Sequence, residues 1–276
     1  MSEITDITEY CRTMVREDDP ERYYVSLFAP AAKQPHLWAL FAFNQEVAKT
    51  RESVSEPMIG EIRLQWWREA LEGIAAGAPR EHPVVLGLAA IPTFNAIGPL
   101  LDIVIDGRAQ DLEMETETGI QTLEQYADMV GGALHEAAAR ILDETLDEGD
   151  AALARASGRA WAMLGILRAL PYQIADTKAF SVTGATTQGL TGLSAEELNE
   201  RLKPLLDPAK EYVEKQYGAA SRKSASKVIK PVLAANAITA RHLRALKRAG
   251  GSPFRMQEFE DGNLRKLVAL LAHHLF

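Results

Sequence analysis

Helical periodicity along almost the whole chain is the feature that most constrains its fold. Residues 55–77 show the pattern, with apolar residues at steps of three and four and charged residues between them. Ser55 suits an N-cap, Pro57 suits a first helical turn, and Gly77 ends the run. The apolar residues predict one buried stripe: Ile59, Ile62, Trp66, Ala70 and Ile74. No segment alternates convincingly with a period of two, so no sheet is predicted.

The same pattern predicts one all-α domain over residues 1–276. Its helices are predicted at 5–17, 21–29, 35–52, 57–76, 83–94, 97–115, 122–146, 150–173, 194–218, 223–249 and 263–275. The longest irregular segment, residues 175–193, is rich in Thr and Gly. It is compatible with a lid, a linker or a long loop.

Local signals refine two helix starts. Capping-box spacing occurs at Thr122 with Gln125 and at Ser194 with Glu197. Trp66 lies on the apolar stripe of its helix, and the tryptophan that follows it lies beside the stripe. Both large rings are therefore predicted to pack in the core.

Charge and cysteine usage exclude several classes of function. The net charge of -8 and the pI of about 5.4 argue against a nucleic-acid partner, which would need an extended basic surface. Two basic segments, 221–230 and 241–248, are interpreted as solvated helix faces. Cys11 is the one cysteine, so no internal disulfide forms. The first residues resemble no targeting segment and no stretch is long and apolar enough to span a membrane, so a bacterial cytoplasmic location is expected.

Acidic residues are the main candidates for chemistry. Asp102 and Asp106 are four residues apart, a spacing that places two carboxylates on one helix face, where they can chelate Mg²⁺. Asp106 and Asp111 flank a glycine in an otherwise apolar helix, so each must reach solvent or line a polar cavity. His273 and His274 are adjacent and diverge on a helix, which argues against a shared metal.

Several segments together resemble the squalene/phytoene synthase family over nearly the whole chain. They are "YYVSLFAP" (23–30), "LWALFAFNQEVAKTRE" (37–52), "LQWWREAL" (64–71), "IDGRAQDL" (105–112), "YADMVGGAL" (126–134), "GILRALPYQIADTKAFSV" (165–182) and "LRKLVAL" (264–270). The resemblance implies an all-α isoprenoid-synthase helical bundle around a central cavity. Active members join two prenyl diphosphates head to head, with Mg²⁺ held by two aspartate-rich helices.

The residues that would hold Mg²⁺ in this family are missing when the motifs are carried over. The aspartates of the first motif fall on Ala48, Lys49 and Glu52, and its diphosphate-binding Arg falls on Gln45. The aspartates of the second motif fall on uncharged residues, Ala169 and Gln173. Magnesium neutralises the charge of the leaving diphosphate, so its ligands are essential to the chemistry. No catalytic residue, metal site or cofactor is therefore predicted, and Mg²⁺ enters only if the chain is an active enzyme.

Two segments are most similar to a catalytically silent branch of the family, typified by a mitochondrial complex I assembly factor. They are "FNQEVAKTRESVSEPMIGEIRLQWWREALEGI" (43–74) and "LRALPY" (167–172). This resemblance implies a non-catalytic assembly or binding factor for respiratory complex I (NADH dehydrogenase). Its partner would be a protein of respiratory complex assembly. The absence of a targeting segment favours a bacterial counterpart.

The resemblance also marks residues expected to line the cavity: Ser26, Gln45, Lys49, Asp106, Asp111, Tyr126, Arg168 and Tyr172. Two alternatives stay open. One is an active head-to-head prenyl transferase dependent on Mg²⁺, in which Asp102, Asp106 or Asp111 would be the first candidates for catalysis. The other is a protein that binds an isoprenoid or quinone lipid without turnover. Membrane contact is expected to be peripheral at most, at the inner membrane.

Overall fold

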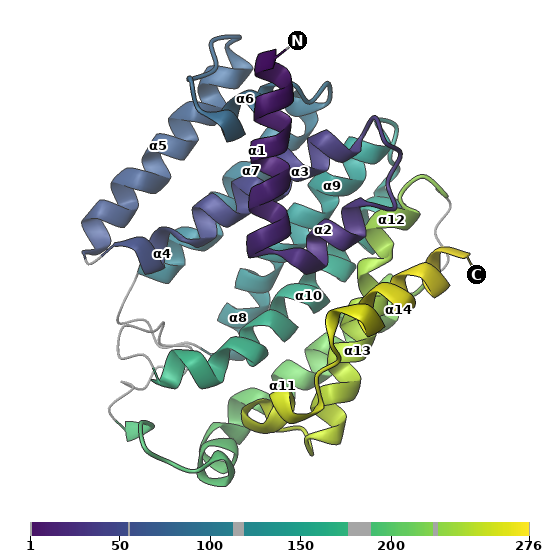
Figure 1. Cartoon of the computed structure of the whole chain (residues 1–276). Helices are drawn as coiled ribbons and strands as arrows, with labels where there is room; N and C mark the ends of the chain where they lie inside the picture. Colours follow the sequence, from purple (N-terminus) through teal and green to yellow (C-terminus); the bar gives the residue numbers. More distant parts are fainter. Residues whose placement is uncertain (1, 55, 113–118, 176–188, 223–225, 276) are drawn as a thin grey trace.

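The computed structural model describes residues 2–54, 56–112, 119–175, 189–222 and 226–275, and no strand occurs in these ranges (Figure 1). The first elements are α1 (Ser2–Asp18), α2 (Pro20–Ser26), α3 (Gln34–Ala48), α4 (Thr50–Ser53), α5 (Pro57–Ala75), α6 (Pro83–Ala89), α7 (Phe94–Ala109) and the 3-10 turn η1 (Gln110–Leu112). They are followed by α8 (Ile120–Ala127), the π-helical turn η2 (Asp128–Gly132), α9 (Ala133–Leu142), α10 (Glu148–Ala175), α11 (Ala195–Ala220), α12 (Lys230–Leu233), α13 (Ala235–Arg248), η4 (Pro253–Phe259) and α14 (Asn263–Leu275).

The long helix α10 organises the bundle. It packs against α8, η2, α9, α11, α13 and η4 (Figure 1). Its first turns contribute Ala151 and Ala154 to a core shared with α1, α3, α5, α6, α7 and α9. Its later turns contribute Leu164 and Leu167 to a second core shared with α8, α11 and α13. One helix therefore contributes to both of these hydrophobic cores.

Two helical backbones approach each other closely where η2 meets α10. A Cβ atom added to Gly158 would overlap the carbonyl of Gly131, and one added to Gly131 would overlap the carbonyl of Gly158. Only glycine allows two backbones to come this close. The sequence "VGG" thus sets the position of η2 on α10, in agreement with the resemblance found in residues 126–134.

The apolar stripe predicted for α5 is only partly right. Ala70 and Ile74 are buried, but Ile59 is 48% exposed and Ile62 is 65% exposed. The buried face of α5 instead runs through Gly60, Leu64, Trp67, Ala70, Leu71 and Ile74. Both sets recur at helical spacing, so periodicity alone could not choose between them. The packing of α7 and α6 on α5 decides which face is covered.

The two tryptophans of α5 have different environments. Trp67 is 2% exposed and meets the ring of Phe43 edge to face, with centroids 5.4 Å apart. Trp66 is partly exposed and packs against Trp67 and His82. The prediction of a core position is therefore confirmed for Trp67. Trp66 packs against the same core but is only half-buried.

Capping predictions had mixed outcomes. Ser194 and Glu197 form a capping box at the start of α11, as expected. Thr122 does not cap α8, because that helix begins at Ile120 with Gly119 as its N-cap. Three long predicted helices, at 35–52, 122–146 and 223–249, are each divided into shorter elements.

Some predictions fall outside the described residues. The proposed cap Ser55 and most of the irregular segment, 176–188, lie there. Glu56 is the N-cap residue of α5. Among the helices that are described, none combines the length and apolar character needed to cross a bilayer.

Candidate functional site

The first motif region lies where α3 ends and α4 begins. Gln45 and Lys49 are one turn apart on α3 and its C-cap, and both contact the junction of α1 and α2. The Gln45 amide donates to Asp19 Oδ2 at 3.2 Å, and Lys49 Nζ lies 2.5 Å from Asp18 Oδ2. Asp19 also caps α2 and pairs with Arg22 at 2.6 Å. Asp18 and Asp19 are therefore already paired with protein cations.

The second motif region lies on α10, opposite η4. Ala169 contributes to a pocket of about 260 Å³ together with Arg168 and Tyr172 of the same helix. Gly165 and the η4 region supply the rest of the lining: Pro253, Met256, Gln257 and Glu260. The side-chain oxygen of Gln173 is buried without a hydrogen-bond partner in the described structure. Aspartates are absent from the mapped positions of this region as well.

Arg168 belongs to a network of charges that is built around the buried Glu21. Its Nε donates to Glu260 Oε1 at 2.7 Å, and its Nη1 lies 3.7 Å from Glu21 Oε2. Glu21 Oε1 also accepts from Lys266 Nζ at 2.5 Å and lies 2.9 Å from His242 Nε2. The network joins α2, α10, α13, α14 and the residue that follows η4. The positive charge of Arg168 is thus directed at protein carboxylates.

The carboxylates of this network stay ionised. Burial would raise the pKa of Glu21, but the hydrogen bond with His242 and the charges of Arg168 and Lys266 outweigh it and lower that pKa to about 2. The hydrogen bond with His242 likewise lowers the pKa of Glu260 to about 2, against the effect of its partial burial. The network therefore holds one buried carboxylate, Glu21, and one half-buried carboxylate, Glu260, in their charged form.

Two predicted site residues, Asp111 and Tyr126, are brought together between η1 and α8. The Tyr126 hydroxyl donates to Asp111 Oδ2 at 3.0 Å and accepts from Arg108 Nη1 at 2.7 Å. Arg108 also contacts Asp111 at 3.4 Å. Burial raises the pKa of Asp111 and the pKa of Tyr126. The cluster therefore brings together the Asp111 carboxylate, the Arg108 guanidinium and the Tyr126 hydroxyl.

Asp102 and Asp106 lie elsewhere. Both are exposed on α7, and Asp106 Oδ1 pairs with Arg68 of α5 at 2.7 Å. Partial burial and the neighbouring charge of Asp106 raise the pKa of Asp102. Since this face of α7 is open to solvent, the pair does not extend the Asp111–Tyr126 cluster. The sequence predicted that Asp106 either reaches solvent or lines a polar cavity, and in the structure Asp106 reaches solvent.

The last two predicted residues have local roles. Ser26 is fully buried, donates to the carbonyl of Tyr23 at 2.6 Å and accepts from Trp38 Nε1 at 2.8 Å. Tyr172 is 63% exposed, and its hydroxyl accepts from the amide of Gln257. Ser26 thus fixes α2 on α3, and Tyr172 connects α10 with η4. Among the eight predicted residues, Asp111 and Tyr126 are in direct contact, and Arg168 and Tyr172 line one pocket; that all eight line one cavity stays a prediction.

The residues at the motif positions do not fit Mg²⁺. This ion is held mainly by carboxylate oxygens, whereas Ala48 and Ala169 have no donor atom and Lys49 adds a cation. Glu52 is exposed, and Gln173 offers one amide oxygen. Within the ranges that the structure describes, no three His, Cys, Asp or Glu side chains converge as metal ligands. No prenyl-transfer step through Mg²⁺ follows from these residues.

Sequence reasoning missed a second charged cluster as well as most of the first. Arg155 donates to both carboxylate oxygens of Asp128 at 2.7 Å and to Glu136 Oε2 at 2.8 Å. Arg159 donates to Asp128 Oδ1 at 2.6 Å. The four-residue spacing of Arg155 and Arg159 was a usable signal for this cluster. No local signal pointed to Glu21, whose partner Lys266 is 245 residues away.

Comparison with known proteins identifies the family. The family model described as squalene/phytoene synthase matches residues 15–267. The chain belongs to the squalene/phytoene synthase family.

Two mammalian relatives carry the name "NADH dehydrogenase (ubiquinone) complex I, assembly factor 6". The mouse protein is 33% identical over 193 residues, which cover 70% of this chain and 57% of the relative. The human protein is 33% identical over 172 residues, which cover 62% and 51%. The 15-cis-phytoene synthase of Synechocystis sp. (strain ATCC 27184 / PCC 6803 / Kazusa) is 26% identical over 152 residues, covering 54% and 44%. The chain spans about half the length of the curated relatives it matches.

Solved structures show the same fold. A dehydrosqualene synthase in complex with ligand is similar with a TM-score of 0.76 at 18% identity, over 99% of this chain and 96% of that one. Squalene synthase HpnC from Alicyclobacillus acidocaldarius gives a TM-score of 0.73 at 17% identity, over 92% and 98%. The predictions of an all-α isoprenoid-synthase fold and of resemblance to the assembly-factor branch are confirmed.

Proposed function

We propose that this chain is a non-catalytic member of its family that assists assembly of a respiratory NADH dehydrogenase. The pairing of Lys49 with Asp18 at 2.5 Å carries the proposal, because it places a neutralised cation where an active enzyme would hold a magnesium ligand. The names of the mouse and human relatives support the assembly role. The protein would act in the cytoplasm, in peripheral contact with the membrane that holds the dehydrogenase.

The energetics of the reaction support a loss of catalysis. Loss of one well-placed electrostatic element commonly costs about 3–4 kcal/mol of transition-state stabilisation. Here Ala48, Ala169 and Gln173 stand at mapped ligand positions, and Asp18 and Asp19 are held by Lys49 and by Arg22 and Gln45. Such losses need not add. Even one such loss would slow diphosphate ionisation by roughly a hundredfold to a thousandfold.

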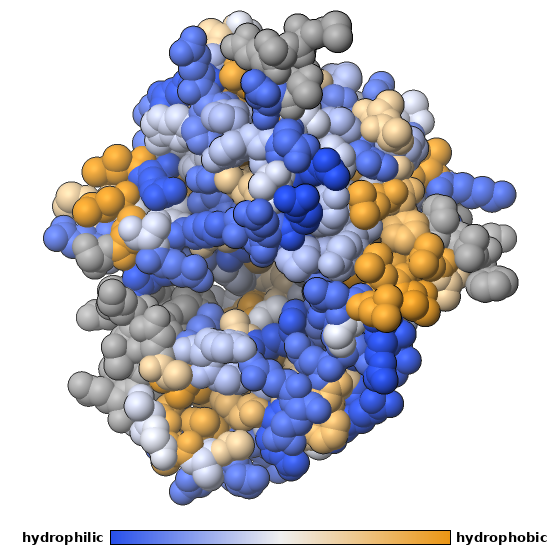
Figure 2. Space-filling model, viewed as in Figure 1, coloured by the Kyte–Doolittle hydropathy of each residue, from blue (hydrophilic) through white to orange (hydrophobic). Residues whose placement is uncertain are grey.

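An assembly factor acts through its surface. The start of α5 has an exposed apolar patch that a protein partner could bind. Met58 is 72% exposed and Ile62 is 65% exposed, with Ile59 beside them. Figure 2 shows an apolar patch at this free end of α5, next to α4. Large apolar side chains grouped in this way are typical of protein contact sites. The same segment belongs to the stretch that resembles the assembly-factor branch.

Deletion of the gene tests the proposal. The amount of assembled NADH dehydrogenase should fall, while squalene and carotenoid levels stay unchanged. If the deletion strain instead lacks a prenyl product that the wild-type gene restores, the protein is an active prenyl transferase. If a lipid-bound form is recovered and dehydrogenase assembly is normal, isoprenoid or quinone binding without turnover is the better description.

Surface variants extend this test to the partner. Met58→Ser with Ile62→Ser should leave the melting temperature nearly unchanged, because both side chains are exposed, but should fail to restore dehydrogenase assembly. Glu61→Ala is the matched control on the same helix, since Glu61 is also exposed. Full complementation by the double variant would exclude this patch as the partner surface.

A further inference from the structure

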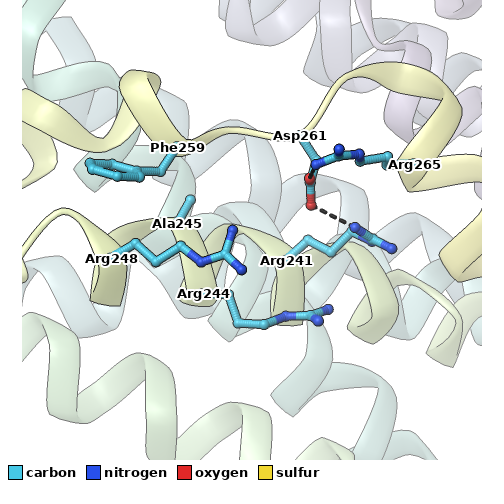
Figure 3. A pocket seen from close by; sticks show the side chains of 7 residues that line it. All are labelled: Arg241, Arg244, Ala245, Arg248, Phe259, Asp261 and Arg265. Atoms are coloured by element: carbon cyan, nitrogen blue, oxygen red, sulfur yellow. Dashed lines mark hydrogen bonds and ion pairs between the residues drawn. The ribbon is translucent and has the colours of Figure 1, made fainter.

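A groove rich in arginine lies between α13 and the segment that connects η4 to α14. It has a volume of about 340 Å³, and its walls come from seven residues: Arg241, Arg244, Ala245, Arg248, Phe259, Asp261 and Arg265. Figure 3 shows three arginines along α13, and above them lie Phe259 of η4, Asp261 of the connecting segment and Arg265 of α14. Four guanidinium groups therefore face one carboxylate.

The charges in the groove are unbalanced. Asp261 pairs with Arg241 at 2.6 Å and with Arg265 at 3.2 Å, so one carboxylate forms ion pairs with two cations. Arg244 and Arg248 are exposed, and no carboxylate within the described ranges forms an ion pair with either. Arg241 also has a buried Nε atom without a hydrogen-bond partner there. The groove is thus a local positive site on a protein whose net charge is -8.

The arrangement suits a phosphate group. Arg241, Arg244 and Arg248 are separated by three and four residues, so they share one face of α13. Guanidinium groups bind phosphate oxygens through paired, charge-assisted hydrogen bonds. A solvated helix face, the interpretation made from sequence, does not explain why Arg265 of another helix joins the same row.

An apolar stripe on α14 borders the groove. Leu264, Val268 and Leu271 are 76%, 54% and 49% exposed and recur at steps of four and three. They lie on the side of the helix opposite Lys266, whose ammonium group is buried against Glu21. Figure 2 shows an apolar patch over α14 with hydrophilic residues of the α13 region directly below it. Arg265 follows Leu264 directly and so connects the stripe to the groove.

We propose that the groove and the stripe together dock this protein on an anionic membrane surface. The arginines bind the phosphate of anionic phospholipid headgroups, and Leu264, Val268 and Leu271 enter the interface between headgroups and acyl chains. A row of cations beside an exposed apolar helix face is the pattern of interfacial helices. A small free phosphate would bind in the groove but would make no contact with the apolar stripe. The inference stands on these residues and does not depend on the assembly role.

Sedimentation with lipid vesicles tests the proposal. The protein should sediment with vesicles that contain phosphatidylglycerol and not with vesicles of phosphatidylcholine alone, and added salt should weaken the binding. Arg244→Glu with Arg248→Glu should weaken binding at least about twentyfold, at roughly fivefold for each lost arginine. Leu264→Ser with Val268→Ser should weaken it while leaving the salt dependence in place.

A matched control separates local from overall charge. Lys203→Glu with Lys215→Glu makes the same change in net charge on α11, where both residues are exposed and outside the groove, and should bind like the wild type. Equal loss in both charge-reversed variants, or equal binding to both kinds of vesicle, would overturn the proposal. Saturable binding of inorganic phosphate without vesicle binding would also overturn it and assign the groove to a small anion. Melting curves confirm that each variant is folded.

Discussion

The ends of α3 and α10 carry the positions onto which the two aspartate-rich motifs of the family map from the sequence, and the two regions differ in how their charged side chains are paired. At the end of α3, Lys49 is 44% exposed and forms a surface ion pair with Asp18. On α10, the half-buried Arg168 belongs to a network with Glu260 and with the buried Glu21. Surface ion pairs contribute little to stability, whereas breaking a buried pair is costly. Substitutions in the first region should therefore cost little stability, whereas the charges of the second region stabilise the packing of the helices.

The largest effect is expected in the buried network. Glu21→Gln leaves Lys266 and Arg168 facing an uncharged amide, so the free energy of unfolding should fall by about 3–5 kcal/mol. Chemical denaturation monitored by circular dichroism measures the change. Lys49→Met is the matched comparison in the first region. Equal effects of the two variants would contradict the distinction between the regions.

Acid should act on the same network. Glu21 has a pKa of about 2 in the folded protein against an ordinary value of 4.5, so its stabilisation is complete above pH 4.5 and is lost as the pH falls through 4.5 toward 2. The difference corresponds to about 3 kcal/mol. Unfolding measured from pH 6 to pH 2.5 should show this loss. The Glu21→Gln variant should show a flatter dependence, and an unchanged slope would mean that other carboxylates dominate.

Restoring the acids should weaken the fold without creating an enzyme. A variant with Ala48→Asp, Ala169→Asp and Gln173→Asp, together with Glu52→Asp, adds three carboxylates to the two regions that already hold Lys49 and the Arg168 network. Poorly compensated carboxylates at the partly buried positions should lower the free energy of unfolding by about 1–3 kcal/mol without Mg²⁺. Thermal melts with and without Mg²⁺ measure this effect. Prenyl transfer by the variant would show that the remaining site is intact.

The smallest effect is expected at the surface pair. Lys49→Met should change the free energy of unfolding by no more than about 1 kcal/mol, because the pair is exposed to solvent and salt. Asp18→Asn should behave in the same way, since it removes the other partner of the same contact. If either variant lowered the free energy of unfolding by several kcal/mol, this pair would stabilise the fold as strongly as the Arg168 network does.

Local patterns predicted the helices well but not the faces that they bury. The capping box at Ser194 was readable because both partners lie within one turn. The buried face of α5 was not, since Ile62 and Trp67 both belong to apolar sets with helical spacing. Only the helices packed on α5 decide between such faces.

The candidate site was harder to predict than the fold. Asp111 and Tyr126 were expected in one cavity and do form a hydrogen bond. Arg168 was recognised, but its partners Glu21 and Glu260 come from distant segments without a shared motif. Contacts over such separations depend on the complete packing of the bundle, which no local spacing records.

Calorimetry with Mg²⁺ and a non-hydrolysable prenyl diphosphate tests the central claim most directly. With Lys49 paired to Asp18 and no aspartate at the mapped positions, we expect no saturable binding that requires both the metal and the diphosphate. An active squalene or phytoene synthase serves as the positive control. Saturable, metal-dependent binding of the diphosphate to this protein would contradict the account and would show that other residues have taken over the role of the lost aspartates.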